Sequence, residues 1–231
     1  MRNYLVVILL ACFSASSLLA AESALRPFTA SYNVQLNGFK VGELTRSLKQ
    51  LDDSSYRLET YARTTGLTAL FVSDVAKEVS LMQMVGSELL PLKYEYNYTG
   101  RGRDVSERQK FDWQQGRLTS LRNGNRTIID LAPGTLDKQV FEIAMRQDLE
   151  QGMLAGSHQV AVRGRIRDYD YQVLGNERIV TRPFGEVDTI KVARGTTIMW
   201  LAPEHDFMLV RIQQQDRNNK ADSFILSVEY H

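Results

Sequence analysis

Two Arg-Gly-Arg tripeptides are the residues of this chain best suited to binding chemistry. The planar guanidinium group of arginine donates paired hydrogen bonds to a phosphate or a carboxylate. If both tripeptides lie at the same rim of a sheet, they hold the anionic headgroup of a lipid or a sugar. The alternative is that they are solvated hairpin tips. The candidate binding residues are Arg101, Arg103, Arg163 and Arg165.

Aromatic side chains recur at every second position of one segment, which places them on one face of a strand. They are Tyr94, Tyr96 and Tyr98, and Phe111 and Trp113 follow with the same spacing. Tyrosine combines an apolar ring with a hydroxyl group, so a wall of such residues suits a ligand that is partly apolar. The alternative is that these rings pack across strands beneath a helix.

No catalytic or metal-binding motif is present in the sequence. The histidines, His158, His205 and His231, lie far apart, and no HxH or HExxH spacing occurs. Neither a GxSxG segment for a nucleophile nor a GxxxxGKS/T phosphate loop is present. We therefore predict no catalytic residue, no metal and no cofactor, and a protein that is not an enzyme.

The first 21 residues have the features of a secretory signal peptide. Arg2 provides the positive charge, an apolar core follows that is too short to remain as a membrane anchor, and small residues end the segment. Cleavage is predicted after Ala20 or Ala21. Residues 22–231 are then expected to form one β-rich domain in the periplasm.

Cys12 gives a second interpretation of the N-terminal segment. Residues 9–12 (LLAC) resemble the lipobox of bacterial lipoproteins, which would make Cys12 a lipidated N-terminus. On the main interpretation this cysteine, which is the only one in the chain, is removed with the signal peptide. The mature protein then has no disulfide, and core packing must stabilise it.

Charge and hydropathy argue against a nucleic acid as partner and against a membrane span. The full chain has 28 basic and 27 acidic residues, and loss of Arg2 makes the two counts equal. A neutral chain with scattered basic residues lacks the field that attracts nucleic acid. No apolar run after the signal peptide approaches the ~20 residues needed to cross a bilayer, so no transmembrane span is predicted.

Most of the mature chain shows the period-two alternation of half-buried strands. Residues 28–36 alternate in this way, and Asn37-Gly38 follows as a hairpin turn. Residues 159–174 predict either one bent strand or a hairpin, and Gly175 predicts a turn before a further strand. The alternation of the last strand falls on Phe224, Leu226, Val228 and Tyr230.

One segment, residues 136–154, has helical periodicity. Its apolar side chains recur at i, i+4 and form one broad stripe, with residues 133–135 as the loop and N-cap and Gly156 as the expected end. The stripe is either the seam that closes the core or a lid whose methionines adapt to acyl chains. The stripe residues that we consider for ligand contact are Phe141, Met145 and Leu149.

The predicted fold class is mainly β. The strands and turns indicate a curved antiparallel sheet or half-barrel of about ten or more strands, with one amphipathic helix in its concavity. Whether the sheet closes into a barrel is left open by the sequence, as is the oligomeric state.

Five short motifs are distributed along the chain: residues 37–43 (NGFKVGE), 111–113 (FDW), 199–203 (MWLAP), 208–212 (MLVRI) and 224–226 (FIL). Together they resemble an uncharacterised family of exported bacterial proteins, the domain of unknown function 3108 (DUF3108). The resemblance covers nearly the whole mature chain. It implies no activity and supplies no catalytic residues, because the family has no assigned function.

The arrangement of strand-rich halves around a central helix is also similar to the lipoprotein carrier and receptor of the Lol system. That fold is an open antiparallel half-barrel whose concave apolar face is covered by helices. The similarity implies a pocket for acyl chains.

The leading hypothesis is a periplasmic, non-enzymatic binding or carrier protein for an amphipathic, lipid-like envelope component. The alternative is a structural or interaction protein that pairs with an envelope partner through a sheet edge. A third hypothesis, an enzyme on envelope lipid or glycan, lacks a catalytic set. A carrier predicts an apolar cavity of roughly 300 Å³ or more beneath the helix, whereas a filled core with an exposed apolar patch favours the interaction protein.

Overall fold

The computed structural model describes residues 25–66, 69, 73–100, 102–215 and 218–231. The predicted signal peptide with Cys12, and Arg101, lie outside these residues. Within them, fourteen antiparallel strands form one sheet in the order β8-β7-β6-β5-β4-β3-β2-β1-β14-β13-β12-β11-β10-β9. The strands are β1 (Phe28–Leu36), β2 (Phe39–Gln50), β3 (Ser55–Thr64), β4 (Val75–Val85), β5 (Glu88–Gly100), β6 (Arg103–Asp112), β7 (Arg117–Arg122), β8 (Asn125–Asp130), β9 (Ala155–Val162), β10 (Arg165–Thr181), β11 (Gly185–Arg194), β12 (Thr197–Ala202), β13 (Met208–Gln215) and β14 (Lys220–Tyr230).

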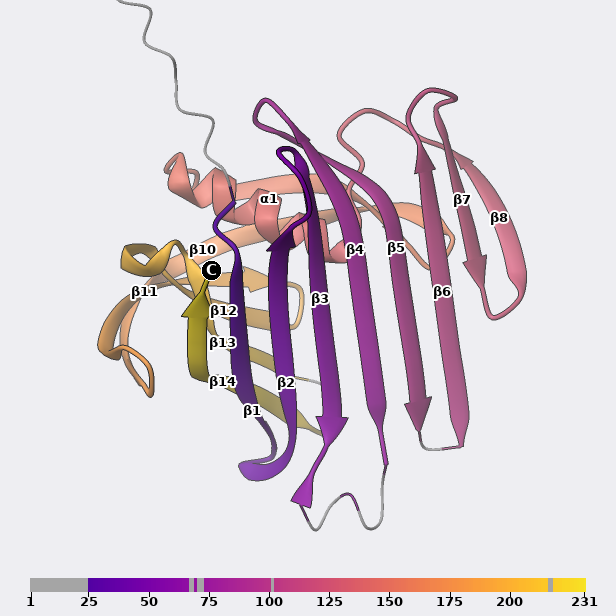
Figure 1. Ribbon diagram of the computed structural model, residues 1–231. Coiled ribbons are helices and arrows are strands. Elements are labelled where there is room, and N and C mark those ends of the chain that lie inside the picture. Colours follow the sequence, from indigo (N-terminus) through magenta and orange to yellow (C-terminus); the bar gives the residue numbers. More distant parts are fainter. Residues whose placement is uncertain (1–24, 67–68, 70–72, 101, 216–217) are drawn as a thin grey trace, which may run out of the picture.

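The sheet is strongly curved, and the helix α1 (Lys138–Glu150) lies on its concave side. In Figure 1, β1 to β8 form a front wall, β10 to β13 cross behind it, and α1 lies between the two walls. The strands at the two ends of the order, β8 and β9, do not pair with each other in the described part of the chain. The prediction of a mainly-β half-barrel with one helix in its concavity is confirmed, and the sheet is open.

The first hairpin forms as its sequence predicts. Phe28, Ala30 and Tyr32 on β1 point inward and are buried, because apolar side chains occupy every second position. Asn37 and Gly38 both adopt positive φ angles, of 50° and 87°, which is the conformation that a two-residue turn with this twist requires. β2 then returns alongside β1 in an antiparallel register.

α1 is shorter at both ends than the periodicity predicts. Leu136 does not join the helix because its backbone pairs with the edge strand β9, donating to the carbonyl of Gln159 and accepting from the amide of Ala161 at 2.8 Å each. At the other end the helix stops at Glu150, and Gly152 with a φ of 82° turns the chain toward β9. Gly156, the expected end, therefore lies within β9.

Two strand predictions made from the sequence are wrong because each strand contains a β-bulge. Gly175 is not a turn, because β10 runs through it: the register with β11 skips Leu174, and Gly175 accommodates the bulge with a φ of 135°. In β14 the register with β1 skips Leu226, so Ile225 is the buried residue and the expected alternation breaks there. The hairpin interpretation between β9 and β10 is confirmed, with its turn at residues 163–164.

The buried side chains form two clusters. The larger cluster surrounds α1 and combines residues of β1 to β5 with residues of β9 to β14. In the smaller cluster the tip of the β9–β10 hairpin packs onto β5, β6 and β7. Its buried members are Tyr94, Phe111, Leu118, Leu131 and Ala161.

Asp137 is the N-cap of α1 and is fully buried. Its Oδ1 accepts from the backbone amides of Gln139 and Val140, at 2.9 and 3.0 Å, and from the hydroxyl group of Ser80 at 2.8 Å. Its Oδ2 has no hydrogen-bond partner among the described residues. Desolvation by burial raises the pKa of this carboxyl group from 3.8 to about 7.

The substitution Asp137→Asn is expected to change how stability depends on pH. Because the folded-state pKa of about 7 exceeds the ordinary value of 3.8, the folded protein holds a proton in this range that the unfolded chain releases. The wild type should therefore lose stability as pH rises from about 4 to about 7, by at most ~4 kcal/mol, and the Asn variant should lack this loss.

Urea unfolding at pH 4 to 8 measures this difference between the two proteins. Asp168→Asn, which changes an exposed aspartate on β10, is the matched control. Parallel stability curves for the wild type and Asp137→Asn would show that burial does not hold the proton on Asp137.

Candidate functional site

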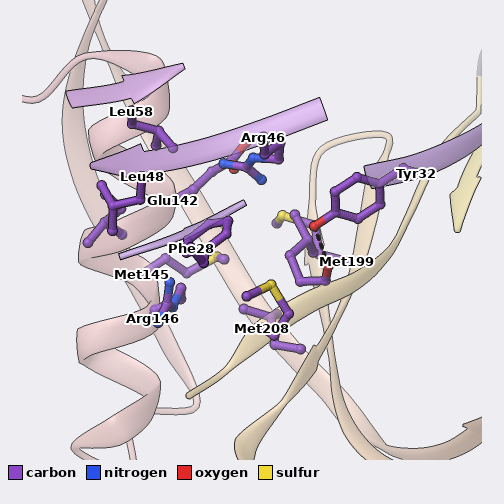
Figure 2. A pocket seen from close by; sticks show the side chains of 13 residues that line it. Phe28, Tyr32, Arg46, Leu48, Leu58, Glu142, Met145, Arg146, Met199 and Met208 are labelled. Atoms are coloured by element: carbon purple, nitrogen blue, oxygen red, sulfur yellow. Dashed lines mark hydrogen bonds and ion pairs between the residues drawn. The ribbon is translucent and has the colours of Figure 1, made fainter. Parts of the chain in front are cut away.

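A narrow apolar cavity lies between α1 and the concave face of the sheet. Its walls come from β1, β2, β3, β12 and β13 as well as from the helix (Figure 2). The open space within it is about 20 Å³, which is enough for about one water molecule. We call this cavity the methionine slit. It is lined by Phe28, Tyr32, Arg46, Leu48, Leu58, Glu142, Ile143, Met145, Arg146, Met199, Leu201, Met208 and Leu209.

Three methionines from different elements occupy the slit. Met145 projects from α1, Met199 from β12 and Met208 from β13, and none is more than 2% exposed (Figure 2). These side chains fill the space, so the open volume is far below the roughly 300 Å³ expected of a preformed ligand cavity. Methionine has three rotatable bonds, and such a lining changes shape more readily than one of branched residues.

Arg46 makes one part of the slit polar. It lies on the inward face of β2, in phase with Leu44 and Leu48, and is only 7% exposed. Its Nη2 lies 2.6 Å from Oε2 of Glu142 on α1. Burial alone would lower the pKa of Arg46, but the carboxylate of Glu142 raises it above its ordinary value, so the guanidinium group stays charged. Its Nε–H has no hydrogen-bond partner in the described part of the chain.

Two further polar groups line the slit. The hydroxyl group of Tyr32 donates to the carbonyl oxygen of Leu209 at 2.8 Å, and burial raises the pKa of Tyr32 to about 12. Arg146 on α1 donates to the carbonyl oxygen of Asp206, and burial lowers the pKa of this arginine. Apart from Arg46, Glu142 and these two residues, the lining is apolar.

A second cavity, of about 200 Å³, adjoins the methionine slit. Arg46 and Glu142 line both cavities, so their ion pair stands between them. We call this space the polar cavity. It is lined by Leu44, Arg46, Thr60, Glu78, Lys138, Gln139, Phe141, Glu142, Tyr169, Arg194 and Ile212.

Lys138, Glu78 and Tyr94 form a connected group beside the polar cavity. The Nζ of Lys138 lies 3.1 Å from Oε1 of Glu78, and the hydroxyl group of Tyr94 donates to the same oxygen at 2.6 Å. Burial alone would lower the pKa of Lys138, but Glu78 raises it. Burial and the Glu78 carboxylate raise the pKa of Tyr94. The positive charge of Lys138 is therefore balanced by the carboxylate of Glu78.

Arg194, at the end of β11, is arranged differently. Its guanidinium carbon lies 4.5 Å from the ring centroid of Tyr169 and 5.8 Å from that of Phe141. No carboxylate of the described residues lies within ion-pair distance of it. The polar cavity thus contains one arginine that is held by aromatic rings and has no anionic partner.

The C-terminal half of α1 is fixed to the sheet by a carboxylate. Oδ2 of Asp148 lies 2.6 Å from Nε2 of His158 on β9, and the hydroxyl group of Tyr171 on β10 donates to the same oxygen at 2.8 Å. Burial and this contact raise the pKa of Tyr171. The histidine ring also stacks on Tyr171, so this cluster joins the helix to two strands.

The aromatic residues singled out in the sequence lie mainly in the smaller cluster. Tyr94 is buried there, Tyr96 and Trp113 pack against it, and the indole N–H of Trp113 donates to the carbonyl of Pro91 at 2.8 Å. Tyr98 lies under the guanidinium group of Arg103. Of the set, Tyr94 and Tyr96 contact Lys138 of the polar cavity, and Tyr94 also donates to Glu78 there.

The three stripe residues of α1 have separate surroundings. Met145 lines the methionine slit and Phe141 lines the polar cavity. Leu149 is buried in the larger cluster near the end of the helix.

The described residues of the two Arg-Gly-Arg tripeptides, 102–103 and 163–165, do not meet. The backbone N–H of Arg163, in the β9–β10 turn, donates to Oε1 of Glu107 at 2.7 Å, and Arg165 is exposed. Glu107 lies four residues beyond Arg103 on β6, a distance of ~13 Å along a strand. No contact between the described residues of the two tripeptides brings them into one site.

The described residues contain neither a metal-binding cluster nor a membrane-spanning helix. No group of three or more His, Cys, Asp or Glu side chains there is arranged to hold a metal ion. No helix in that part of the chain has the length and apolar character that crossing a membrane requires.

Sequence reasoning missed the arginines that line the two cavities. Arg46 lies between Leu44 and Leu48 in the period-two pattern of β2, and Arg194 follows Val192 in the same phase on β11. A charged residue at an inward position of a strand is the signal that would have identified both. In the sequence, Met199 and Met208 stand out only as parts of short motifs, residues 199–203 and 208–212.

Comparison with known proteins gives a family and a fold. The family model described as "Protein of unknown function (DUF3108)" matches residues 31–225. No curated protein matches the chain significantly. A crystal structure of a β-barrel-like protein of domain of unknown function DUF1849 from Brucella abortus is similar to this structure, with a TM-score of 0.59 and 9% sequence identity. The similarity covers 90% of this chain and 98% of that one, and at this identity it indicates a shared fold.

Replacement of Tyr171 by phenylalanine tests how the helix is held. The substitution removes one hydrogen bond to a partly buried carboxylate, so we expect a loss of about 2 kcal/mol in the free energy of unfolding. Amide hydrogen exchange should accelerate in the last turn of α1. Tyr61→Phe, at an exposed position of β3, is the control. Equal effects of the two substitutions would contradict a specific role for the Asp148 contact.

Proposed function

We propose that this chain, which belongs to the DUF3108 family, is a periplasmic binding or carrier protein for an amphipathic component of the cell envelope. The ligand's apolar chain would lie in the methionine slit, between α1 and the sheet. The single observation that carries the proposal is the form of this space. An apolar slit and a polar cavity share a buried, incompletely paired guanidinium group, that of Arg46, in their linings.

The composition of the lining supports a ligand with one apolar end and one polar end. Apolar side chains make up most of the slit, and two of its charged side chains, Arg46 and Glu142, also line the polar cavity. Binding sites that combine an apolar wall with a few placed polar groups are typical of small-molecule pockets.

The small open volume means that a ligand must displace protein side chains. Met145, Met199 and Met208 occupy the space that a chain would take, and rotation about their side-chain bonds is the least demanding way to vacate it. α1 is held at its N-cap by Ser80 and near its C-terminus by His158, so the adaptable packing lies between two fixed ends.

The periplasmic location is part of the proposal and rests on the first 21 residues of the sequence. N-terminal sequencing of the protein from a periplasmic fraction tests it, and a new N-terminus after Ala20 or Ala21 is expected. A membrane-bound form labelled by palmitate would instead support lipidation at Cys12.

A partner protein is the second candidate, and the exposed edge of β8 favours it. Five of the six residues of this strand, Asn125–Asp130, are exposed, including Ile128, and the strand has an unpaired side in the described sheet. An unpaired edge is able to accept a strand from another chain. Crosslinking from position 128 in cells would detect such a partner.

The binding function predicts that the chain retains or acquires an amphiphile. Protein purified without detergent should show a lipid-like mass by native mass spectrometry and organic extraction, or should bind laurate with one-to-one stoichiometry. An apo mass together with no binding of laurate, dodecyl phosphate or glycerol monolaurate would contradict the proposal.

The double substitution Met145→Leu with Met199→Leu tests the slit directly. Leucine conserves volume but is branched and less adaptable, so each swap should cost less than about 1.5 kcal/mol of stability. Affinity for the amphiphile should fall by about tenfold, equivalent to ~1.4 kcal/mol. Met82→Leu is the matched control, because Met82 is fully buried but does not line the slit. Equal affinity in all three proteins would place the ligand elsewhere.

A further inference from the structure

Positive charge exceeds negative charge around the polar cavity. Arg46, Lys138 and Arg194 line it together with two carboxylates, those of Glu78 and Glu142. Glu142 pairs with Arg46 at 2.6 Å and Glu78 pairs with Lys138 at 3.1 Å. Among the described residues, Arg194 has no carboxylate partner. Within the described chain its charged group contacts aromatic rings instead of an acid.

Arg194 is oriented for binding although it lacks an anion. The rings of Tyr169 and Phe141 hold its guanidinium plane in place, and contact with ring faces leaves its N–H groups unused by a carboxylate. A guanidinium group fixed in this way loses little conformational entropy when it binds a planar or tetrahedral anion.

Arg46 offers a second donor at the boundary with the slit. It is more than nine-tenths buried, and its Nε–H has no partner among the described residues. A buried donor without a partner is costly and would gain from an incoming oxygen atom. The side chain of Glu142, which is 32% exposed, is close enough to water to turn outward when an anion takes its place.

We infer that the polar cavity binds the anionic headgroup, a carboxylate or a phosphate, of the amphiphile whose chain occupies the methionine slit. This inference rests on the proposed function and adds the headgroup class. Arg194 and Arg46 are the residues that contact the headgroup. The shared lining residues Arg46 and Glu142 place the headgroup directly beside the slit that receives the chain.

The test compares ligands that share a chain and differ in the headgroup. The full mature protein is titrated by calorimetry with dodecyl phosphate, laurate and the neutral glycerol monolaurate, each below its micelle concentration. At least one anionic ligand should bind about tenfold more tightly than the neutral one, since hydrogen bonds to a charged group are stronger. The tighter of the two anionic ligands identifies the headgroup as a phosphate or a carboxylate.

Substitution of Arg194 assigns the preference to the polar cavity. Arg194→Gln should abolish the preference by weakening the anionic ligand about tenfold, with the neutral ligand unaffected. Arg194→Lys should retain part of it. Arg178→Gln, at an exposed arginine of β10, is the matched control and should retain it fully. Thermal unfolding of each variant checks that the fold is intact.

Three outcomes overturn the inference. Equal affinity for anionic and neutral ligands, or a preference that survives Arg194→Gln, removes the headgroup site and leaves the proposed function standing. Inorganic phosphate that binds as tightly as dodecyl phosphate identifies a site for a free anion rather than for a headgroup. No binding of any of the three amphiphiles removes the inference together with the proposed function.

Discussion

The concave face of the open sheet is larger than the helix that covers it. α1 has 13 residues and is ~20 Å long, whereas the 13 residues of β5 alone span ~43 Å. The tip of the β9–β10 hairpin closes part of the remainder, where Gln109 donates to the carbonyl of Ala161 and Glu107 accepts from the amide of Arg163. Both cavities are lined in part by residues of the helix.

The contacts that hold α1 divide it into fixed and adaptable parts. Asp137 accepts three hydrogen bonds at the N-cap, and Asp148 accepts two near the other end. These bonds are directional and at least partly buried, so the ends of the helix are costly to move. The middle of the helix combines the Arg46–Glu142 ion pair with apolar packing through Met145, whose thioether has no directional requirement. That apolar packing is the least directional of the contacts beneath the helix, and it lies beside the ion pair.

The sequence predicted the fold well and the site poorly, for one physical reason. Alternation and i, i+4 spacing are local, so the strands, the first hairpin and the helix are readable from neighbouring residues. The bulges at Leu174 and Leu226 depend on the partner strand, and so does the pairing of Leu136 that shortens α1. A site assembled from β2, α1 and β11 depends on strand order, which no local pattern contains. The Arg-Gly-Arg motifs are conspicuous locally, yet the turn that carries Arg163 docks at Glu107, ~13 Å along β6 from Arg103.

The ion pair between buried Arg46 and half-buried Glu142 is hard to explain by stability alone. Desolvation of two charges offsets most of their attraction, and apolar residues of similar volume stabilise such positions equally well or better. A leucine at position 46 would continue the inward apolar face that Leu44 and Leu48 begin. The arginine instead keeps one donor unpartnered at the boundary of an apolar slit. A buried donor without a partner costs stability, and under the headgroup inference an anionic group that accepts this hydrogen bond would offset the cost.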